Sequence, residues 1–150
     1  MKVGVLMGSP NDREKMQPAA DTLEKFGIEA DVRVMSAHRT PAAVTEFASS
    51  ARENGYVAVI CGAGMAAHLA GVVAAHTTLP VVGVPLASGA LNGVDALYST
   101  VQMPPGIPVA TVAVGGAVNA AILVVEMLAI SDEEMAKRLD EDRRQRAGVS

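Results

Sequence analysis

The chain has 150 residues, of which 50% are hydrophobic and 19% charged, and its formal net charge is −4. This charge argues against a nucleic-acid partner, which calls for a basic patch. The single cysteine, Cys61, excludes an internal disulfide and suits a reducing cytosol. The N-terminus is broken too soon by Gly and Pro for a signal peptide, and no uninterrupted apolar run could span a membrane. We therefore expect a cytoplasmic protein with no membrane partner.

Five short apolar runs predict the strands of a parallel sheet. They cover residues 2–7, 31–35, 57–61, 80–85 and 109–114. Most are β-branched and nearly continuous, as in strands that are covered on both faces. The intervals are long enough for crossover helices, which are right-handed in such folds. The sequence therefore predicts one α/β domain over 1–150, with a three-layer (αβα), flavodoxin-like parallel sheet of about five strands.

Helical patterns fill several of these intervals. Residues 11–25 have apolar positions close to the helical period and stop at Gly27. Residues 41–54 open with Pro41, which suits a first helical turn, and stop before Gly55. Residues 117–129 are apolar on nearly all sides, which predicts burial against the sheet or a partner subunit. A C-terminal helix at about 131–147 should start with Ser131 as its N-cap, and its mixed charges predict a solvated surface helix.

In folds of this class, ligands bind at the carboxyl ends of the strands. We therefore expect the loops at 8–12, 36–41, 62–68 and 86–93 to share one edge of the sheet. Low charge content also suggests that some surface is buried against other copies of the chain.

The first loop, GSPND, follows a strand and opens a helix. Ser9 and Asn11 can donate hydrogen bonds to a phosphate oxygen, or they can cap the helix. The negative charge of Asp12 makes it a poor phosphate ligand but a good acceptor for sugar hydroxyls. An ordinary N-cap explains this loop as well as a ligand site does.

The second loop, SAHRTP, places His38 beside Arg39. Arginine offers a planar, permanently charged fork to a phosphate or carboxylate, and histidine is the commonest general acid or base near neutral pH. Ser36 adds a hydroxyl. A solvent-facing His-Arg pair is the alternative, but together with the first loop these residues suggest an anionic ligand handled by proton transfer.

The third loop, GAGMAAH, formally matches the G-x-G-x-x-A dinucleotide pattern. The acidic residue expected about 20 positions later is missing, which argues against a nicotinamide cofactor. His68 and His76 are eight residues apart, or about 12 Å along a helix, so they cannot share a metal. A single histidine such as His68 in an apolar helix is more often a core residue than a ligand.

Long, unusual strings carry a family resemblance. GSPND, FGIEADVRVMSAHRTP, ICGAGMAAHLAGVVAAHTTLPVVGVP, LNGVDALYSTVQMPPGIPVATVAV and NAAILVVEMLA occur in order over roughly residues 3–130. The sequence resembles the 5-(carboxyamino)imidazole ribonucleotide mutases of de novo purine (IMP) biosynthesis. The arginine of AHRT resembles the mutase class, whereas the related carboxylases that use free carbon dioxide usually have AHKT.

The resemblance implies a cytoplasmic isomerase that assembles as a homo-octamer and uses no metal or organic cofactor. The reaction moves a carboxylate from the exocyclic nitrogen to ring carbon 4 of a ribonucleotide substrate, by decarboxylation and recarboxylation with histidine acid/base catalysis. Two alternatives stay open. One is carboxylation of aminoimidazole ribonucleotide by free carbon dioxide, and the other is a non-catalytic nucleotide-binding relative.

The resemblance also implies the site residues. The catalytic residues would be His38 and His68, and the substrate-binding residues would be Ser9, Asn11, Asp12, Ser36, Ala37, Arg39, Gly62, Ala63, Gly64 and Leu69. In these roles Arg39 would bind the phosphate, Asp12 the ribose hydroxyls, and the loop 87–93 would close the site.

Three residues depart from the family pattern, which usually has serine at Asn11, glycine at Met65 and proline at Ala70. Asn11 can still donate a hydrogen bond, so that change is mild. Met65 adds a large flexible side chain where the family keeps the backbone bare. Either the pocket is reshaped, or Met65 points away into a subunit contact.

Overall fold

The computed structural model describes residues 1–148, which are built around a five-stranded parallel sheet. The strands, in chain order, are β1 (Lys2–Met7), β2 (Glu29–Val34), β3 (Tyr56–Gly64), β4 (Val81–Leu86) and β5 (Ala110–Thr111). Their spatial order is β2-β1-β3-β4-β5, and every neighbouring pair is parallel. This is the flavodoxin-like order. The predicted fold class is confirmed.

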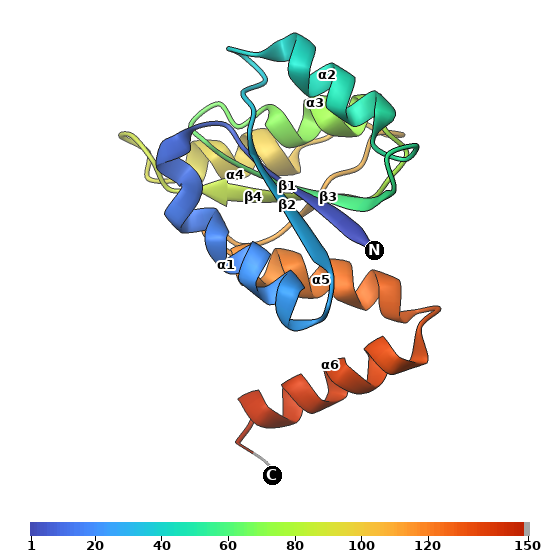
Figure 1. Cartoon of the computed structure of the whole chain (residues 1–150). Helices are drawn as coiled ribbons and strands as arrows, with labels where there is room; N and C mark the ends of the chain where they lie inside the picture. The colour runs from blue at the N-terminus through green and yellow to red at the C-terminus, as the bar shows by residue number, and fades with distance from the viewer. Residues whose placement is uncertain (149–150) are drawn as a thin grey trace.

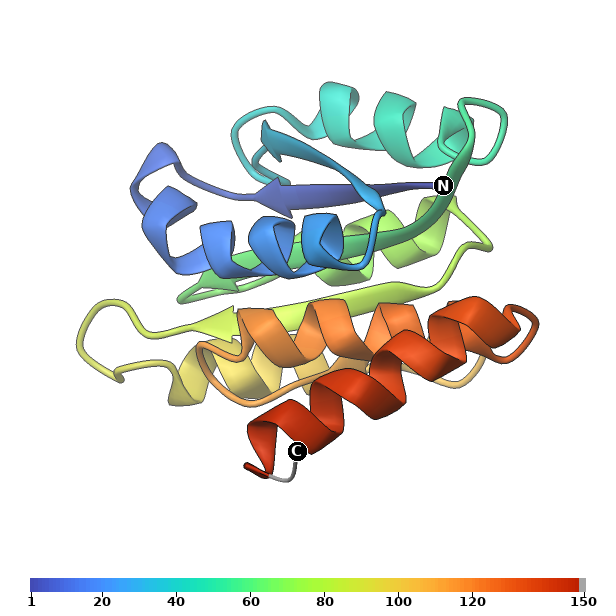
Figure 2. The same ribbon diagram turned by 60° about the horizontal axis from the view of Figure 1, so that its bottom comes forward.

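Helices cover both faces of the sheet (Figure 1). They are α1 (Arg13–Lys25), α2 (Pro41–Ser50), α3 (Leu69–His76), α4 (Val94–Val101), α5 (Ala117–Ala129) and α6 (Glu133–Arg146), with a short 3-10 helix, η1 (Pro10–Asp12), before α1. Helices α1 and α5 lie together on one face, and α2 and α3 lie on the other. Figure 2 shows α6 running along the outside of α5.

The sheet separates two hydrophobic cores. Val5 joins Leu23 of α1 and Val124 of α5 on one side, whereas Leu6 joins Phe47 of α2 on the other. Val5 and Leu6 face opposite sides because successive side chains of a strand alternate. Strand β1 is therefore buried on both faces, as its continuous apolar run predicts.

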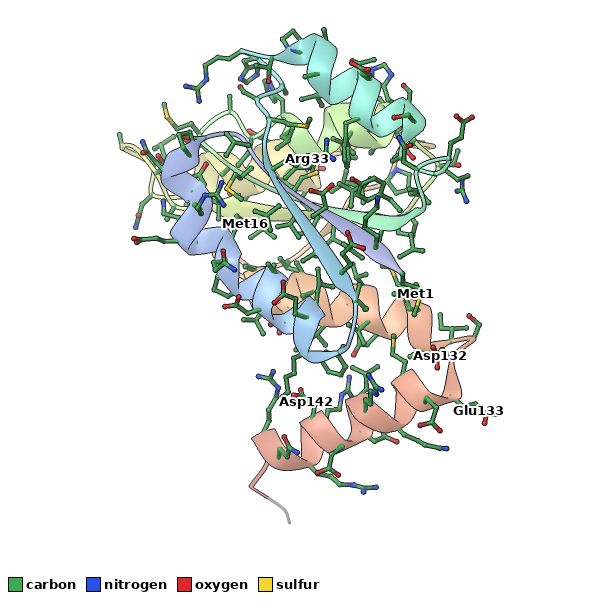
Figure 3. The ribbon with its side chains drawn as sticks, viewed as in Figure 1. Met1, Met16, Arg33, Asp132, Glu133 and Asp142 are labelled. Carbon is green, nitrogen blue, oxygen red and sulfur yellow. The ribbon has the colours of Figure 1, made fainter. Side chains whose placement is uncertain are left out.

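Glycines in the central strands let two helices approach the sheet closely. A Cβ atom on Gly62 of β3 would lie 2.3 Å from the sulfur of Met16, and one on Gly83 of β4 would lie 2.3 Å from Cγ2 of Thr100. Figure 3 shows Met16 directed from α1 towards the sheet. These glycines thus fix how closely α1 and α4 pack, and α1 carries part of the site.

The strand predicted at 109–114 is confirmed, but its length is wrong, because only Ala110 and Thr111 pair with β4. The backbone N–H of Gly115 still donates to the carbonyl of Pro85 at 2.8 Å. The chain then turns through a hydrogen bond from Gly116 N–H to the carbonyl of Ala113. This turn ends the strand early and starts α5, which packs against the sheet as its apolar pattern predicts.

The C-terminal helix corrects two expectations. Its N-cap is Asp132 rather than Ser131, since the Asp132 side chain accepts a hydrogen bond from the backbone N–H of Met135 at 3.0 Å. The helix is also not wholly solvated, because Met135 and Leu139 are buried in the core beside α5. Within residues 1–148, no helix is both long enough and apolar enough to cross a bilayer.

Asp142 ties this helix to the rest of the domain. Its carboxylate is 4% exposed and lies 2.5 Å from both Lys25 of α1 and Arg146 of α6. Figure 3 shows Asp142 on the side of α6 that faces the domain. The hydrogen bonds from Arg146 and Lys25 lower the pKa of the Asp142 carboxyl below its ordinary value. A mixed-charge helix thus packs through two apolar side chains and one buried carboxylate, whose two cationic partners are half exposed.

Candidate active site

A pocket of about 390 Å³ opens at the carboxyl ends of the strands. It is lined by residues from all four of the loops that were expected to share this edge. Every predicted site residue except Gly62 belongs to its lining: Ser9, Asn11, Asp12, Ser36, Ala37, His38, Arg39, Ala63, Gly64, His68 and Leu69. The fold therefore gathers residues that are spread over 61 positions of sequence.

Gly62 lies beneath this pocket rather than in its wall. It is buried in β3 against Met16, and its carbonyl accepts a hydrogen bond from the backbone N–H of Gly8 at 3.2 Å. The resemblance had implied that its backbone lines the pocket. Gly62 instead has a structural role, because its carbonyl holds the first loop against the end of β3.

The first loop is shaped by Ser9. Its side chain accepts a hydrogen bond from the backbone N–H of Asn11 at 3.2 Å and so caps η1. The capping interpretation of this loop is therefore confirmed. Ligand binding by Ser9 and Asn11 stays a prediction, which their place in the pocket lining supports. The single turn of η1 places Asp12 at the pocket wall, where its side chain is largely buried.

Burial raises the pKa of the Asp12 carboxyl, and the nearby charges of Lys15 and Arg39 partly oppose that effect. A buried carboxylate between two cations is a strong hydrogen-bond acceptor. The arrangement suits a neutral hydroxyl donor better than an anion.

Arg39 links the first loop to the second. Its guanidinium donates to the carbonyl of Gly8 at 3.0 Å, and its backbone N–H donates to Oγ of Ser36 at 3.1 Å. The backbone N–H of Ser36 in turn donates to the hydroxyl of Thr40. These bonds close the 36–40 loop into a turn just before α2, and they aim one permanent cation at the pocket.

Two histidines meet inside the pocket. Nε2 of His38 lies 2.7 Å from Nδ1 of His68, and the rings are nearly perpendicular at 83° with centroids 4.8 Å apart. His68 directly precedes α3 and is therefore a pocket residue, not the core residue that an apolar helix alone suggests. At this distance a hydrogen bond joins the two rings, and the ring tautomers decide which nitrogen donates and which accepts.

Sequence reasoning missed Lys15 and Ser88, which also line the pocket. Lys15 sits in the first turn of α1, where a lysine is ordinarily part of a solvated face. Its position three residues after Asp12 places both on the same side of the chain and could have indicated it. Ser88 follows β4 in the 86–93 loop, whose place at this edge was expected.

Met65 lines the pocket as well. It lies close to Gly89, which supports a changed pocket wall, and a subunit contact of its exposed part stays a prediction. The Met65 side chain is 57% exposed in the single chain.

A larger hollow, of about 950 Å³, lies at the opposite edge of the sheet. It is lined by the end of α3 with His76, by the segments before β4 and β5, and by the turn after α2 with Arg52. His76 is the only histidine there, and it faces none of the paired groups that define the smaller pocket. Size alone therefore does not mark the site of chemistry.

An α/β domain with a histidine pair, an arginine and a buried carboxylate at the carboxyl edge has the composition of an enzyme site for a small anionic substrate. The family model described as AIR carboxylase matches residues 2–148. The chain belongs to the AIR carboxylase family.

Curated relatives resemble nearly the whole chain. The protein named N5-carboxyaminoimidazole ribonucleotide mutase is 56% identical in Brucella melitensis, over 95% of this chain and 89% of that protein. The protein of the same name in Aquifex aeolicus is 55% identical over 92% of this chain and 83% of its own length.

The solved structures agree with these relatives. PurE of Treponema denticola superposes with a TM-score of 0.88 at 30% identity and covers 98% of this chain and 92% of its own. A 3-dehydroquinate dehydratase-like protein of Bifidobacterium longum, at 16% identity and a TM-score of 0.56, shares the fold alone.

Proposed function

We propose that the chain catalyses the mutase reaction for which these relatives are named. It converts 5-(carboxyamino)imidazole ribonucleotide into 4-carboxy-5-aminoimidazole ribonucleotide, a step of de novo purine (IMP) biosynthesis. Curated mutases of 55–56% identity over almost the entire chain support this assignment. The observation that carries it structurally is the contact between His38 and His68, within a pocket that Arg39 and Asp12 also line.

The reaction needs one proton to leave and one to arrive. The carbamate N–C bond breaks, carbon dioxide is released, and the exocyclic nitrogen takes up a proton. Carbon dioxide then bonds to ring carbon 4, which gives up its own proton. Two hydrogen-bonded imidazoles can supply a proton to the exocyclic nitrogen and accept the proton that leaves ring carbon 4. We therefore assign both transfers to His38 and His68.

Substrate binding follows from the remaining groups. Arg39 and the polar atoms of Ser9 and Asn11 lie together at the first two loops and suit the phosphate. Asp12 suits the ribose hydroxyls because its carboxylate can only accept when ionised. The small residues Ala63 and Gly64 leave room beside the histidines for the base and for carbon dioxide.

Holding the freed carbon dioxide beside ring carbon 4 is the enzyme's main kinetic task. The test is therefore a substrate labelled with carbon-13 in the transferred carboxylate, converted in buffer that contains unlabelled bicarbonate. Retention of the label in the product supports the mutase. Complete loss of the label, with a rate that rises with bicarbonate, would instead support the alternative carboxylase.

We also propose that the chain acts in the cytoplasm as a homo-octamer. The family resemblance is one support, and an apolar surface is another. Leu91, Val94, Tyr98 and Val101, in and before α4, are between 45% and 64% exposed. Val94, Tyr98 and Val101 are spaced to share one face of α4, and such a patch is suited to a subunit interface. Sedimentation of eight associated chains is the expected result, and a monomer at micromolar concentration would refute it.

A further inference from the structure

The loop at 87–93 touches three other walls of the pocket. The ammonium of Lys15 donates to the carbonyl of Ala87 at 2.9 Å. At the end of β3, a Cβ atom on Gly64 would lie only 2.9 Å from Cβ of Ser88, so the two backbones approach closely. A Cβ atom on Gly89 would lie 3.6–3.8 Å from the side chain of Met65. The 87–93 loop is therefore joined to α1 and to the 62–68 loop by these contacts.

Met65 adopts a backbone conformation that favours glycine. Its φ is +55°, and within residues 1–148 only Asn92 is also a non-glycine with positive φ. Such a conformation brings Cβ too close to the following carbonyl. A strained residue at a pocket rim points to a gain from its side chain. The flexible thioether of Met65 lies beside Gly89, close enough that a Cβ atom built on Gly89 would meet it at 3.6–3.8 Å.

Lys15 is the second support. It lines the pocket, and its three ammonium hydrogens allow it to bond Ala87 while it still faces the ligand space. Its charge adds to that of Arg39 around the buried Asp12. Lys15 therefore links the 87–93 loop to Asp12 and Arg39, the charged residues that we assign to the ribose and the phosphate.

We propose that Met65 and Lys15 are positioning residues that hold the 87–93 loop over the substrate pocket. The identity of the substrate rests on the proposed function, whereas the contacts that hold the loop do not. If the substrate binds tightly only beneath the closed loop, apparent affinity scales with the closed fraction. Replacing Met65 or Lys15 should then weaken substrate binding more than it slows the proton transfers.

The test compares Met65→Gly and Lys15→Gln with wild-type protein. Glycine relieves the backbone at position 65, so the fold is retained while the contact with Gly89 is lost. Hydrogen exchange of the 87–93 amides, measured on the ligand-free protein, should be faster in both variants. KM for the mutase substrate should rise about three- to tenfold, with a smaller change in kcat.

Two controls separate this role from general damage. Met65→Leu keeps an apolar side chain of similar size and should restore much of the protection from exchange. Lys137→Gln removes an exposed lysine that pairs with Glu134 on α6, far from the loop, and should leave exchange and KM as in wild type.

Unchanged exchange in Met65→Gly and Lys15→Gln would overturn the inference, as would a fall in kcat with KM preserved. Because exchange is measured without substrate, failure of this inference is distinguishable from failure of the proposed function. A wild type with no mutase activity but with loosened loops in both variants would overturn only the proposed function.

Discussion

Nε2 of His38 lies 2.7 Å from Nδ1 of His68, although the residues are 30 positions apart in the chain. They follow β2 and β3, two strands that are separated by β1 in the sheet. The contact therefore bridges the end of β1 and brings two loops together above it. Both rings line the pocket, and imidazole is the side chain best suited to transfer protons near neutral pH.

Replacing either histidine should remove most of the turnover. We expect His38→Asn to lower kcat about 10²- to 10⁴-fold, the range typical of a lost general acid or base. Because the two rings act as one unit, His38→Asn combined with His68→Asn should be little worse than either change alone. Steady-state kinetics of the three variants test this, with ligand binding as the control for folding. Full multiplication of the two single losses would show that the histidines act independently.

Arg39 should control substrate binding through its shape as well as its charge. Arg39→Lys keeps the charge but loses the planar fork and the bond to the Gly8 carbonyl. KM should rise by about tenfold, as expected for the loss of one charge-assisted bond. The measurement is a substrate titration at fixed pH. An unchanged KM would mean that the phosphate binds elsewhere.

Asp142 should contribute to stability at neutral pH. Asp142→Asn weakens two charge-assisted bonds to a buried side chain, and we expect the free energy of unfolding to fall by about 1–3 kcal/mol. The lowered pKa of Asp142 gives the sign of the pH effect. Its stabilisation is complete above the ordinary carboxyl pKa near 3.8 and is lost as pH falls through the lower folded value.

Urea unfolding at several pH values measures this difference. Wild type and Asp142→Asn should differ most at neutral pH and converge in acid. A gap that stays constant down to pH 2 would show that the carboxylate charge is not the cause. Lys137→Gln is a suitable surface control, because its salt bridge with Glu134 is exposed on both sides.

A side chain at position 62 should destabilise the protein, because α1 packs closely against the sheet there. In Gly62→Ala the new methyl group must displace Met16, which is fully buried, so we expect a loss of about 1–3 kcal/mol. Gly8→Ala is the matched control, since a Cβ atom there would meet no other heavy atom within 4 Å. Thermal unfolding of both variants is the measurement. Equal midpoints would show that the contact with Met16 yields easily.

The strands and most helices could be predicted because their signals are local. The continuous apolar run at β1 predicts burial on both faces, and Pro41 marks the first position of α2. The strand β5 was predicted at 109–114, but its short length could not be, because the apolar run continues past the two residues that pair with β4. The turn that ends it is set by a hydrogen bond between Gly116 and Ala113.

The site was predicted through loop motifs, and its gaps have a common cause. Lys15 resembles an ordinary exposed helical residue, and its use depends on a carbonyl 72 positions away at Ala87. The direction of Met65 was left open because its backbone conformation and its neighbour Gly89 are tertiary features. Gly62 appeared in the family string, but its burial beneath Met16 becomes visible only when α1 is placed on the sheet.

The most direct test of the central claim follows product formation by absorbance from freshly prepared 5-(carboxyamino)imidazole ribonucleotide, without added bicarbonate. Wild-type protein should form the carbon-carboxylated product rapidly, and His38→Asn should bind the substrate but form almost none. A folded wild-type protein that binds the ribonucleotide and converts none of it would contradict the mutase assignment.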